Sequence, residues 1–119
     1  MQFRYEELRV GNAILDLIDD IYLIANSLPD YEKFGLSSQI RRSAMSIYLN
    51  VAEGSARKTP AEFSRFLTYS MSSLTETDAG LKIAIRRKYI SQKKWCEIRL
   101  KIEQIWISLA ALRNSQKNK

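Results

Sequence analysis

Apolar residues recur every three or four positions along most of the chain, which is the spacing of one face of an α-helix. The pattern predicts four helices, over residues 5–27, 35–54, 60–88 and 92–113, and no segment alternates in the manner of a strand. The predicted core positions are, in chain order, Val10, Ile14, Leu17, Ile18, Ile21, Ala25, Leu28, Ile40, Ala44, Ile47, Val51, Phe63, Phe66, Leu67, Ser70, Leu74, Thr77, Leu81, Ile85, Trp95, Ile98, Ile102, Ile105, Leu109 and Leu112. The fold class that follows is all-α.

The ends of the first two helices are predicted from residues that stop or cap a helix. Pro29 ends the first helix, because the residue before a proline is driven out of the helical conformation. Ser37 or Ser38 is expected to cap the second helix, since a serine hydroxyl can accept a hydrogen bond from the first turn. Gly54 is expected to end that helix, because glycine favours the position just after a C-terminus.

The third helix has the clearest start signal. Thr59 is the expected N-cap, Pro60 takes the first helical position, and Glu62 completes a capping box. Ser91 is expected to cap the fourth helix. Because the links between the helices are short, successive helices should lie antiparallel, which predicts one up-down-up-down four-helix bundle over residues 1–119.

The amino-acid composition excludes several classes of function and leaves the predicted fold unchanged. The chain has no histidine and a single cysteine, Cys96, so it offers no Ser–His hydrolase triad, no cysteine-based zinc site and no internal disulfide. Lys93, Lys94 and Arg99 could lower the thiol pKa of Cys96, but no base partner accompanies them, and an inert thiol is favoured. We expect no catalytic residue, metal or cofactor. The charged N-terminus and the lack of an apolar run of ~18 residues argue against a membrane protein and for a cytoplasmic one.

The net charge of +6 is unevenly distributed. Residues 1–35 hold three basic and seven acidic side chains, whereas residues 36–119 hold sixteen basic and six acidic ones. A chain polarised in this way is suited to binding an anionic polymer or a neighbouring subunit.

Antiparallel topology brings many of the cations to one end of the bundle. The end of the first helix, the start of the second, the end of the third and the start of the fourth should meet there, with Asp30 and Glu32 as the nearby acids. We call this end the basic pole, and its predicted nucleic-acid-binding residues are Arg41, Arg42, Arg86, Arg87, Lys88, Lys93 and Lys94. Guanidinium and ammonium groups clustered in this way bind phosphate. The alternative is that the cations at the end of the third helix only complement its dipole.

A second candidate site is a polar stripe on the second helix. Arg42, Ser46, Asn50 and Glu53 fall on one side of that helix, and Glu76 lies on the adjacent helix. Paired carboxylates can perform acid–base chemistry or bind a metal, but a structural polar network or a subunit interface is favoured, with Arg41 or Arg42 as the partner of the carboxylates. A solvated face is the remaining alternative.

Aromatic residues on the predicted helices could stack on nucleic-acid bases. Tyr48, Tyr69, Trp95 and Trp106 are the candidates. At helical spacing such residues more often belong to a core or an interface, and that interpretation is favoured.

The segment from Gly35 to Leu81 resembles the signature of a bacterial four-helix-bundle family encoded in 23S ribosomal RNA intervening sequences. The resemblance is closest over residues 20–81 and looser towards both ends of the chain. The matching positions are Gly35, Leu36, Gln39, Arg41, Arg42, Ser46, Ile47, Asn50, Ala52, Glu53, Gly54, Arg57, Glu62, Phe63, Phe66, Leu67, Ser73, Leu74 and Glu76. The chain departs from the family pattern at Tyr48, Leu49 and Thr77, which puts details of the polar network or of subunit contacts in doubt, but not the fold.

The resemblance implies a left-handed bundle that assembles into a ring, typically a homopentamer, and it brings no catalytic residues. It also implies relatives that serve as accessory factors of diversity-generating reverse transcriptases. The leading hypothesis is a non-enzymatic homo-oligomer that binds RNA or RNA–DNA through the basic pole. The alternative is a protein–protein scaffold, or an accessory subunit of a nucleic-acid enzyme such as a reverse transcriptase, without direct nucleic-acid contact.

Overall fold

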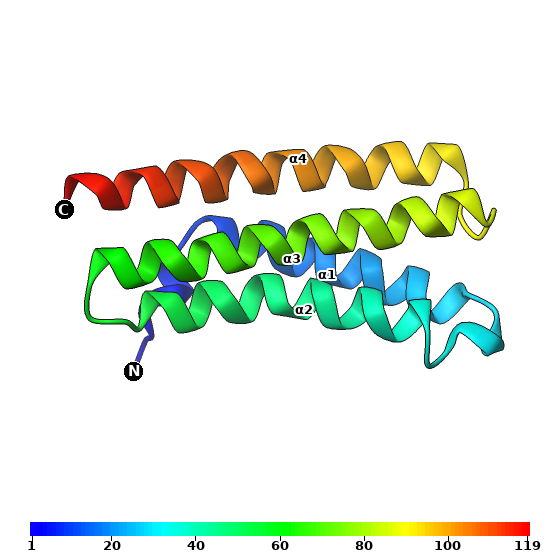
Figure 1. The fold of residues 1–119 in the computed structure, drawn as a ribbon, viewed down its shortest axis with the longest axis horizontal. Helices are drawn as coiled ribbons and strands as arrows, with labels where there is room; N and C mark the ends of the chain where they lie inside the picture. Colours follow the sequence, from blue (N-terminus) through cyan, green and yellow to red (C-terminus); the bar gives the residue numbers. More distant parts are fainter.

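Four long α-helices make up most of the computed structural model, which describes residues 1–119. They are α1 (Val10–Ser27), α2 (Leu36–Ser55), α3 (Pro60–Arg86) and α4 (Gln92–Ser115), and short 3-10 turns occupy Arg4–Glu7, Asp30–Glu32 and Gln116–Asn118. The helices run in alternating directions along the long axis of a body that measures 46 × 24 × 22 Å (Figure 1). The prediction of an all-α four-helix bundle is confirmed.

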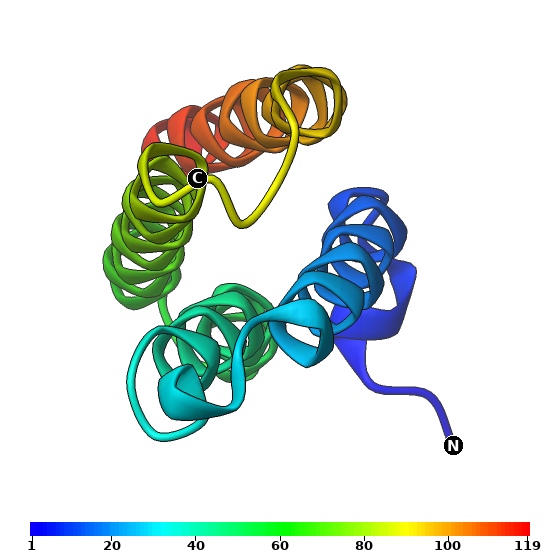
Figure 2. The ribbon, with the colours of Figure 1, turned by 90° about the vertical axis from the view of Figure 1, so that its right-hand side faces the viewer.

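The core forms where one face of each helix meets the others. The largest fully buried side chains are Phe63, Ile14, Leu17, Ile21, Ile40, Ile47, Leu67, Leu74, Leu81, Ile98, Ile105 and Leu109. All of them are among the core positions predicted from the helical spacing. Viewed end-on, the helices follow one another around the bundle in chain order, so that α1 and α4 become neighbours as the first and last helices (Figure 2). An ion pair joins these two helices, with 2.6 Å between Lys101 Nζ and Asp20 Oδ2.

Helices α2 and α3 approach each other most closely where glycine replaces a larger side chain. A Cβ atom added to Gly54 would lie 2.5 Å from Phe66 Cβ, and one added to Gly80 would lie 2.5 Å from Ile40 Cγ2. Real carbon atoms in contact are separated by about 3.5–4.0 Å. The prediction that Gly54 ends α2 is therefore wrong. The helix continues through Ser55, and Gly54 is needed for the packing of α2 on α3.

The first helix begins later than its sequence pattern indicated. Residues Arg4–Glu7 form a 3-10 turn, Leu8 has extended backbone angles, and the α-helix starts only at Val10. The prediction of a helix from Tyr5 is therefore wrong. Tyr5 instead packs edge-on against Tyr48 of α2, with 5.8 Å between the ring centroids, and this contact holds the N-terminal turn against the bundle.

The start of α2 also differs from the prediction. Its N-cap is Gly35, and Ser37 and Ser38 both lie inside the helix. Ser37 Oγ donates to the carbonyl of Ala25 at 3.1 Å, so this hydroxyl links α2 to α1 instead of capping its own helix. The carboxylate of Glu32 takes over part of the capping role, because its Oε1 accepts from the Leu36 N–H at 3.4 Å.

The N-cap residues of the other two helices agree with the sequence, but the predicted capping box is incomplete, because the Glu62 side chain makes no hydrogen bond to the Thr59 N–H. Thr59 Oγ1 accepts from the Glu62 N–H at 3.1 Å, with Pro60 in the first turn, and Ser91 Oγ accepts from the Lys94 N–H at 3.1 Å. Each cap of this kind stabilises a helix by about 0.5–2 kcal/mol. The Ser91 cap fixes where the connection from α3 to α4 ends and hence where Lys93 and Lys94 begin α4, whereas the Thr59 cap starts α3 at the opposite end of the bundle.

Candidate nucleic-acid interface

The basic pole is built from two connections that lie at the same end of the bundle. One runs from α1 to α2 through the 3-10 turn Asp30–Glu32, and the other joins α3 to α4. Figure 2 looks onto this end, and both connections face the viewer. The structure therefore brings cations from α2, α3 and α4 to one end of the molecule, as the antiparallel topology predicted.

The turn after α3 holds three consecutive cations in a defined conformation. The N–H of Tyr89 donates to the Ala84 carbonyl at 2.9 Å, and the N–H of Lys88 donates to the Ile85 carbonyl at 3.0 Å. These two bonds form a Schellman motif, whose central residue adopts the left-handed conformation. That residue is Lys88, with φ 64°, where glycine is the usual choice. The motif presents Arg86, Arg87 and Lys88 as exposed side chains.

A hydrogen-bonded cluster ties the two connections together. The Tyr89 hydroxyl donates to Glu32 Oε2 at 2.8 Å, and the hydroxyls of Tyr31 and Tyr89 lie 3.2 Å apart. Because a phenol carries one proton, Tyr31 must be the donor to Tyr89. Hydrogen bonding with the Tyr89 hydroxyl raises the pKa of Arg87. The cluster thus links Tyr31 and Glu32 of one connection to Tyr89 of the other.

The four remaining cations of the predicted set lie on α2 and in the first turn of α4. Arg41 is half-buried and lines a cleft of about 270 Å³ with Asp30 and Lys33, whereas Arg42 is exposed. Lys93 is exposed and Lys94 is half-buried. The ion pairs in the structure involve none of the seven predicted cations. Their charge is therefore not neutralised by carboxylates of the same chain.

Part of this surface, in the connection from α1 to α2, was not predicted from the sequence. Lys33 lies in the α1–α2 connection and adds an eighth cation, with its Nζ 5.5 Å from the centroid of the Phe34 ring. Tyr31 and Phe34 are both exposed in the same connection. Two aromatic residues in the eight-residue link 28–35, which belongs to no helical face, were the available signal. None of the four aromatic candidates on the helices is an exposed ring at the two connections: Trp95 lies in the first turn of α4 but is buried, Tyr48 is half-buried, and Tyr69 and Trp106 are exposed away from the connections.

The polar stripe of α2 divides into two parts in the structure. Ser46 and Asn50 lie in the seam between α2 and α3, where Ser73 Oγ donates to Ser46 Oγ at 2.9 Å and Asn50 Nδ2 donates to the same oxygen at 3.0 Å. Further along the seam, Thr77 Oγ1 lies 2.8 Å from Ser43 Oγ. The hydroxyl groups of α2 and α3 thus hydrogen-bond to one another across the seam. Small polar residues can therefore lie between these two closely packed helices without leaving buried polar atoms unpaired.

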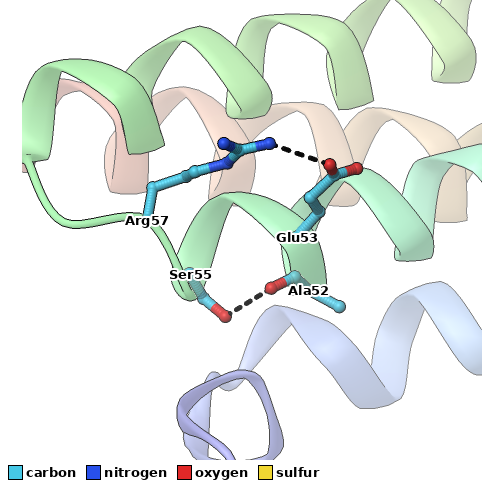
Figure 3. A network of polar contacts seen from close by, with 4 residues as sticks. All are labelled: Ala52, Glu53, Ser55 and Arg57. Carbon is cyan, nitrogen blue, oxygen red and sulfur yellow. Dashed lines mark hydrogen bonds and ion pairs between the residues drawn. The ribbon is translucent and has the colours of Figure 1, made fainter.

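The charged members of the stripe do not take part in that network. Glu53 pairs with Arg57, with 2.9 Å between Oε1 and Nη2, on the exposed surface at the end of α2 (Figure 3). The expectation that Arg41 or Arg42 would be its partner is wrong, because Arg57 lies just beyond the end of α2, only four residues after Glu53. Glu76 is exposed and makes no ion pair, and Arg42 is exposed as well.

A second surface feature lies between α3 and α4. A groove of about 480 Å³ is lined by Leu74, Thr75, Asp78, Arg99, Ile102, Glu103, Trp106 and Ile107. Trp106 is 44% exposed and Ile107 is 67% exposed. The Oδ2 atom of Asp78 lies 3.3 Å from Arg99 Nη1, while its buried Oδ1 has no hydrogen-bond partner. A donor from outside the chain could complete this site.

Two further chemical features bear on the class of protein. No three His, Cys, Asp or Glu side chains lie together in a way that could hold a metal ion. None of the helices is both long enough and apolar enough to span a bilayer. Fold and surface together define a helical bundle that gathers cations from three helices at one end.

Comparison with known proteins identifies the family. The model of the 23S rRNA-intervening sequence protein family matches residues 6–111, and the chain belongs to this family. A similar solved structure is that of a protein with unknown function from the S23 ribosomal protein family of Bacteroides thetaiotaomicron, with 27% sequence identity and a TM-score of 0.80. The similarity covers 87% of this chain and 97% of that one. No curated protein matches the sequence significantly.

Proposed function

We propose that this protein is a non-enzymatic homo-oligomer that binds nucleic acid, either RNA or RNA–DNA, through its basic pole. The observation that carries the proposal is the set of seven predicted cations at one end of the bundle, none of which is engaged in an ion pair. A helix dipole needs one or two cations in the last turn, so it does not account for cations on three helices. A polyanion does.

The energetics of such an interface are dominated by the release of counterions. Each phosphate that is neutralised lowers the slope of log K against log[salt] by about 0.9 for duplex and about 0.7 for single-stranded nucleic acid. Arginines at the pole add bidentate contacts to phosphate oxygens. Binding through this surface should therefore be strong at low salt and fall steeply as salt is added.

Family membership supports the proposal in a limited way. The family is named for an intervening sequence of 23S rRNA, which fits an RNA ligand and a cytoplasmic location. The related protein from Bacteroides thetaiotaomicron is described as having unknown function and supports the fold alone. The proposed ligand is therefore inferred from the charge arrangement of this chain.

The experiment that tests the proposal reverses charges at the two ends of the bundle. One variant carries Arg86→Glu, Lys93→Glu and Lys94→Glu at the basic pole. The matched control carries Lys58→Glu, Lys117→Glu and Lys119→Glu at the opposite end, so its net charge changes equally. Affinities for a labelled RNA are measured at 50 and 200 mM salt.

We expect the pole variant to lose at least tenfold in affinity and its salt slope to become shallower by about 2–3, while the control changes little. Equal losses in both variants would mean that only the total charge matters. No binding by the unmodified protein at 50 mM salt would refute the proposed function.

The proposed assembly is a ring, and the family resemblance implies a homopentamer. In a cyclic ring whose helices run along the axis, every basic pole faces the same side, which multiplies the cationic surface. Light scattering after size exclusion should then give a mass about five times the 13.8 kDa of one chain. A monomeric mass would contradict this part of the proposal and leave the pole itself intact.

A second candidate function is that of a protein–protein scaffold, or an accessory subunit of a nucleic-acid enzyme such as a reverse transcriptase. The groove between α3 and α4 favours it, because Trp106 and Ile107 are exposed beside the unpartnered Oδ1 of Asp78. Exposed tryptophan beside a buried acceptor is typical of a docking hot spot. Trp106→Ala should then weaken subunit or partner association and leave RNA affinity unchanged. Loss of RNA binding alone would count against this function.

A further inference from the structure

We propose that Tyr31 and Phe34 stack on unpaired bases, so that the ligand class of the basic pole is nucleic acid containing single-stranded nucleotides. The inference rests on the proposed function and deepens it. It starts from exposure: Phe34 is 89% exposed and Tyr31 is 73% exposed. Apart from Met1, these are the most exposed of the large hydrophobic side chains, and both lie in the link between α1 and α2.

The link that carries these two residues is held by hydrogen bonds along its length. Within it, the Glu32 N–H donates to the Pro29 carbonyl at 2.9 Å, and the Gly35 N–H donates to the Glu32 carbonyl at 2.9 Å. The Glu32 carboxylate accepts from Leu36 N–H on one side and from the Tyr89 hydroxyl on the other. The aromatic rings therefore project from a fixed turn, and they are not exposed because the chain is loose there.

Tyr31 is held at its hydroxyl end and open over most of its ring. Its hydroxyl lies 3.2 Å from that of Tyr89, which belongs to the connection between α3 and α4. Arg87 lies two residues before Tyr89 in the same connection, and its side chain is exposed. A nucleotide whose base stacks on Tyr31 would therefore have a cation close to its phosphate group.

Phe34 repeats the arrangement with a different cation. Lys33 Nζ lies 5.5 Å from the centre of the Phe34 ring. Each exposed ring is thus paired with a neighbouring positive charge. An aromatic face beside a cation is the combination that binds single strands, because the ring receives a base and the cation receives the backbone.

Stacking decides between single-stranded and duplex ligands. In a duplex the faces of the bases are covered by their neighbours, whereas unpaired bases in loops, bulges and ends offer a free face. A duplex could still reach the cations but would leave both rings in water.

The test compares two RNAs with the same number of phosphates, one unstructured and one a perfect hairpin duplex. Fluorescence anisotropy measures both affinities for the unmodified protein and for Phe34→Leu, which keeps an apolar side chain and removes the ring. Phe34→Trp retains a stacking face, and Tyr31→Phe keeps the ring while losing the hydroxyl. Since Phe34 is almost fully exposed, neither change at this position should affect folding.

We expect the unmodified protein to prefer the unstructured RNA. Phe34→Leu should lower its affinity for that RNA by about 5- to 100-fold and for the duplex by less than twofold, while Phe34→Trp and Tyr31→Phe keep the preference. Equal affinity for the two RNAs, or an equal loss with both in Phe34→Leu, would overturn the inference while leaving the charge-based function standing.

Two other outcomes distinguish failure of the stacking inference from failure of the proposed function. If neither RNA binds at low salt, the proposed function fails and the inference fails with it. If the variant loses binding to vesicles of phosphatidylglycerol and phosphatidylcholine but not to RNA, the aromatic pair serves a lipid surface and the inference is overturned.

Discussion

The close approach of α2 and α3 makes a sharp prediction about Gly80. In Gly80→Ala, the new methyl group would lie 2.5 Å from Ile40 Cγ2, a branched core side chain that is almost fully buried. A normal carbon contact needs about 1 Å more. Either Ile40 must leave its position or the two helices must separate, and both disturb the hydroxyl seam that lies alongside.

The magnitude follows from two opposing effects. Overpacking of a dense core costs about 1–3 kcal/mol. Alanine is about 1 kcal/mol better than glycine inside a helix. Because the clash is severe, we expect a net loss of about 1–2 kcal/mol in the free energy of unfolding. For a domain of this size the melting temperature should fall by roughly 3–6 °C per kcal/mol.

Gly11→Ala is the matched control for this experiment. A Cβ at Gly11 would lie 3.7 Å from Tyr48 Cε1 and 3.9 Å from the Tyr5 carbonyl oxygen, which are ordinary contacts. The same substitution should therefore be neutral or stabilise the protein by up to about 1 kcal/mol. Urea titrations of the three proteins measure both effects. If Gly80→Ala stabilises the protein as much as Gly11→Ala does, the close α2–α3 packing is refuted.

Three further predictions concern other parts of the bundle. Lys88→Gly should stabilise the protein by about 1 kcal/mol in urea titration, because it relieves the left-handed conformation, yet it should make the salt dependence of RNA binding shallower. Thr77→Val should cost about 1–2 kcal/mol, since it leaves Ser43 without its partner across the seam, and an unchanged midpoint would contradict this. Asp20 raises the pKa of Lys101, so their pair stabilises the fold below about pH 10.4, the pKa of an unfolded lysine, and ceases to do so as pH rises through the higher folded value. Lys101→Gln should accordingly lose about 0.2–1 kcal/mol at pH 7 and nothing at high pH, as measured by melting at each pH.

Helical spacing was enough to predict the fold. The regular recurrence of Ile14, Leu17 and Ile21 fixes one buried face, and the same argument holds for the other three helices. The short links then impose antiparallel order, which is why the basic pole could be predicted from topology. Local signals such as Thr59 and Ser91 were equally reliable, because a cap depends on only a few neighbouring residues.

Features that depend on contacts between distant segments could not be predicted. Gly54 carries the usual signal of a helix end, and only the position of Phe66 on α3 shows that it serves helix packing. Ser37 resembles a cap until the Ala25 carbonyl appears within reach. Likewise, Phe34 is exposed because its ring does not pack against the helices. The periodic pattern of apolar residues does not predict how a side chain in a link packs.

The most direct test of the central claim is to locate the RNA on the protein. An unstructured RNA containing 4-thiouridine is bound, irradiated and digested, and the crosslinked peptides are identified by mass spectrometry. The account predicts crosslinks within residues 31–34 and 86–94, at the two connections of the basic pole. Crosslinks confined to the α3–α4 groove around Trp106, or spread evenly over the surface, would contradict it.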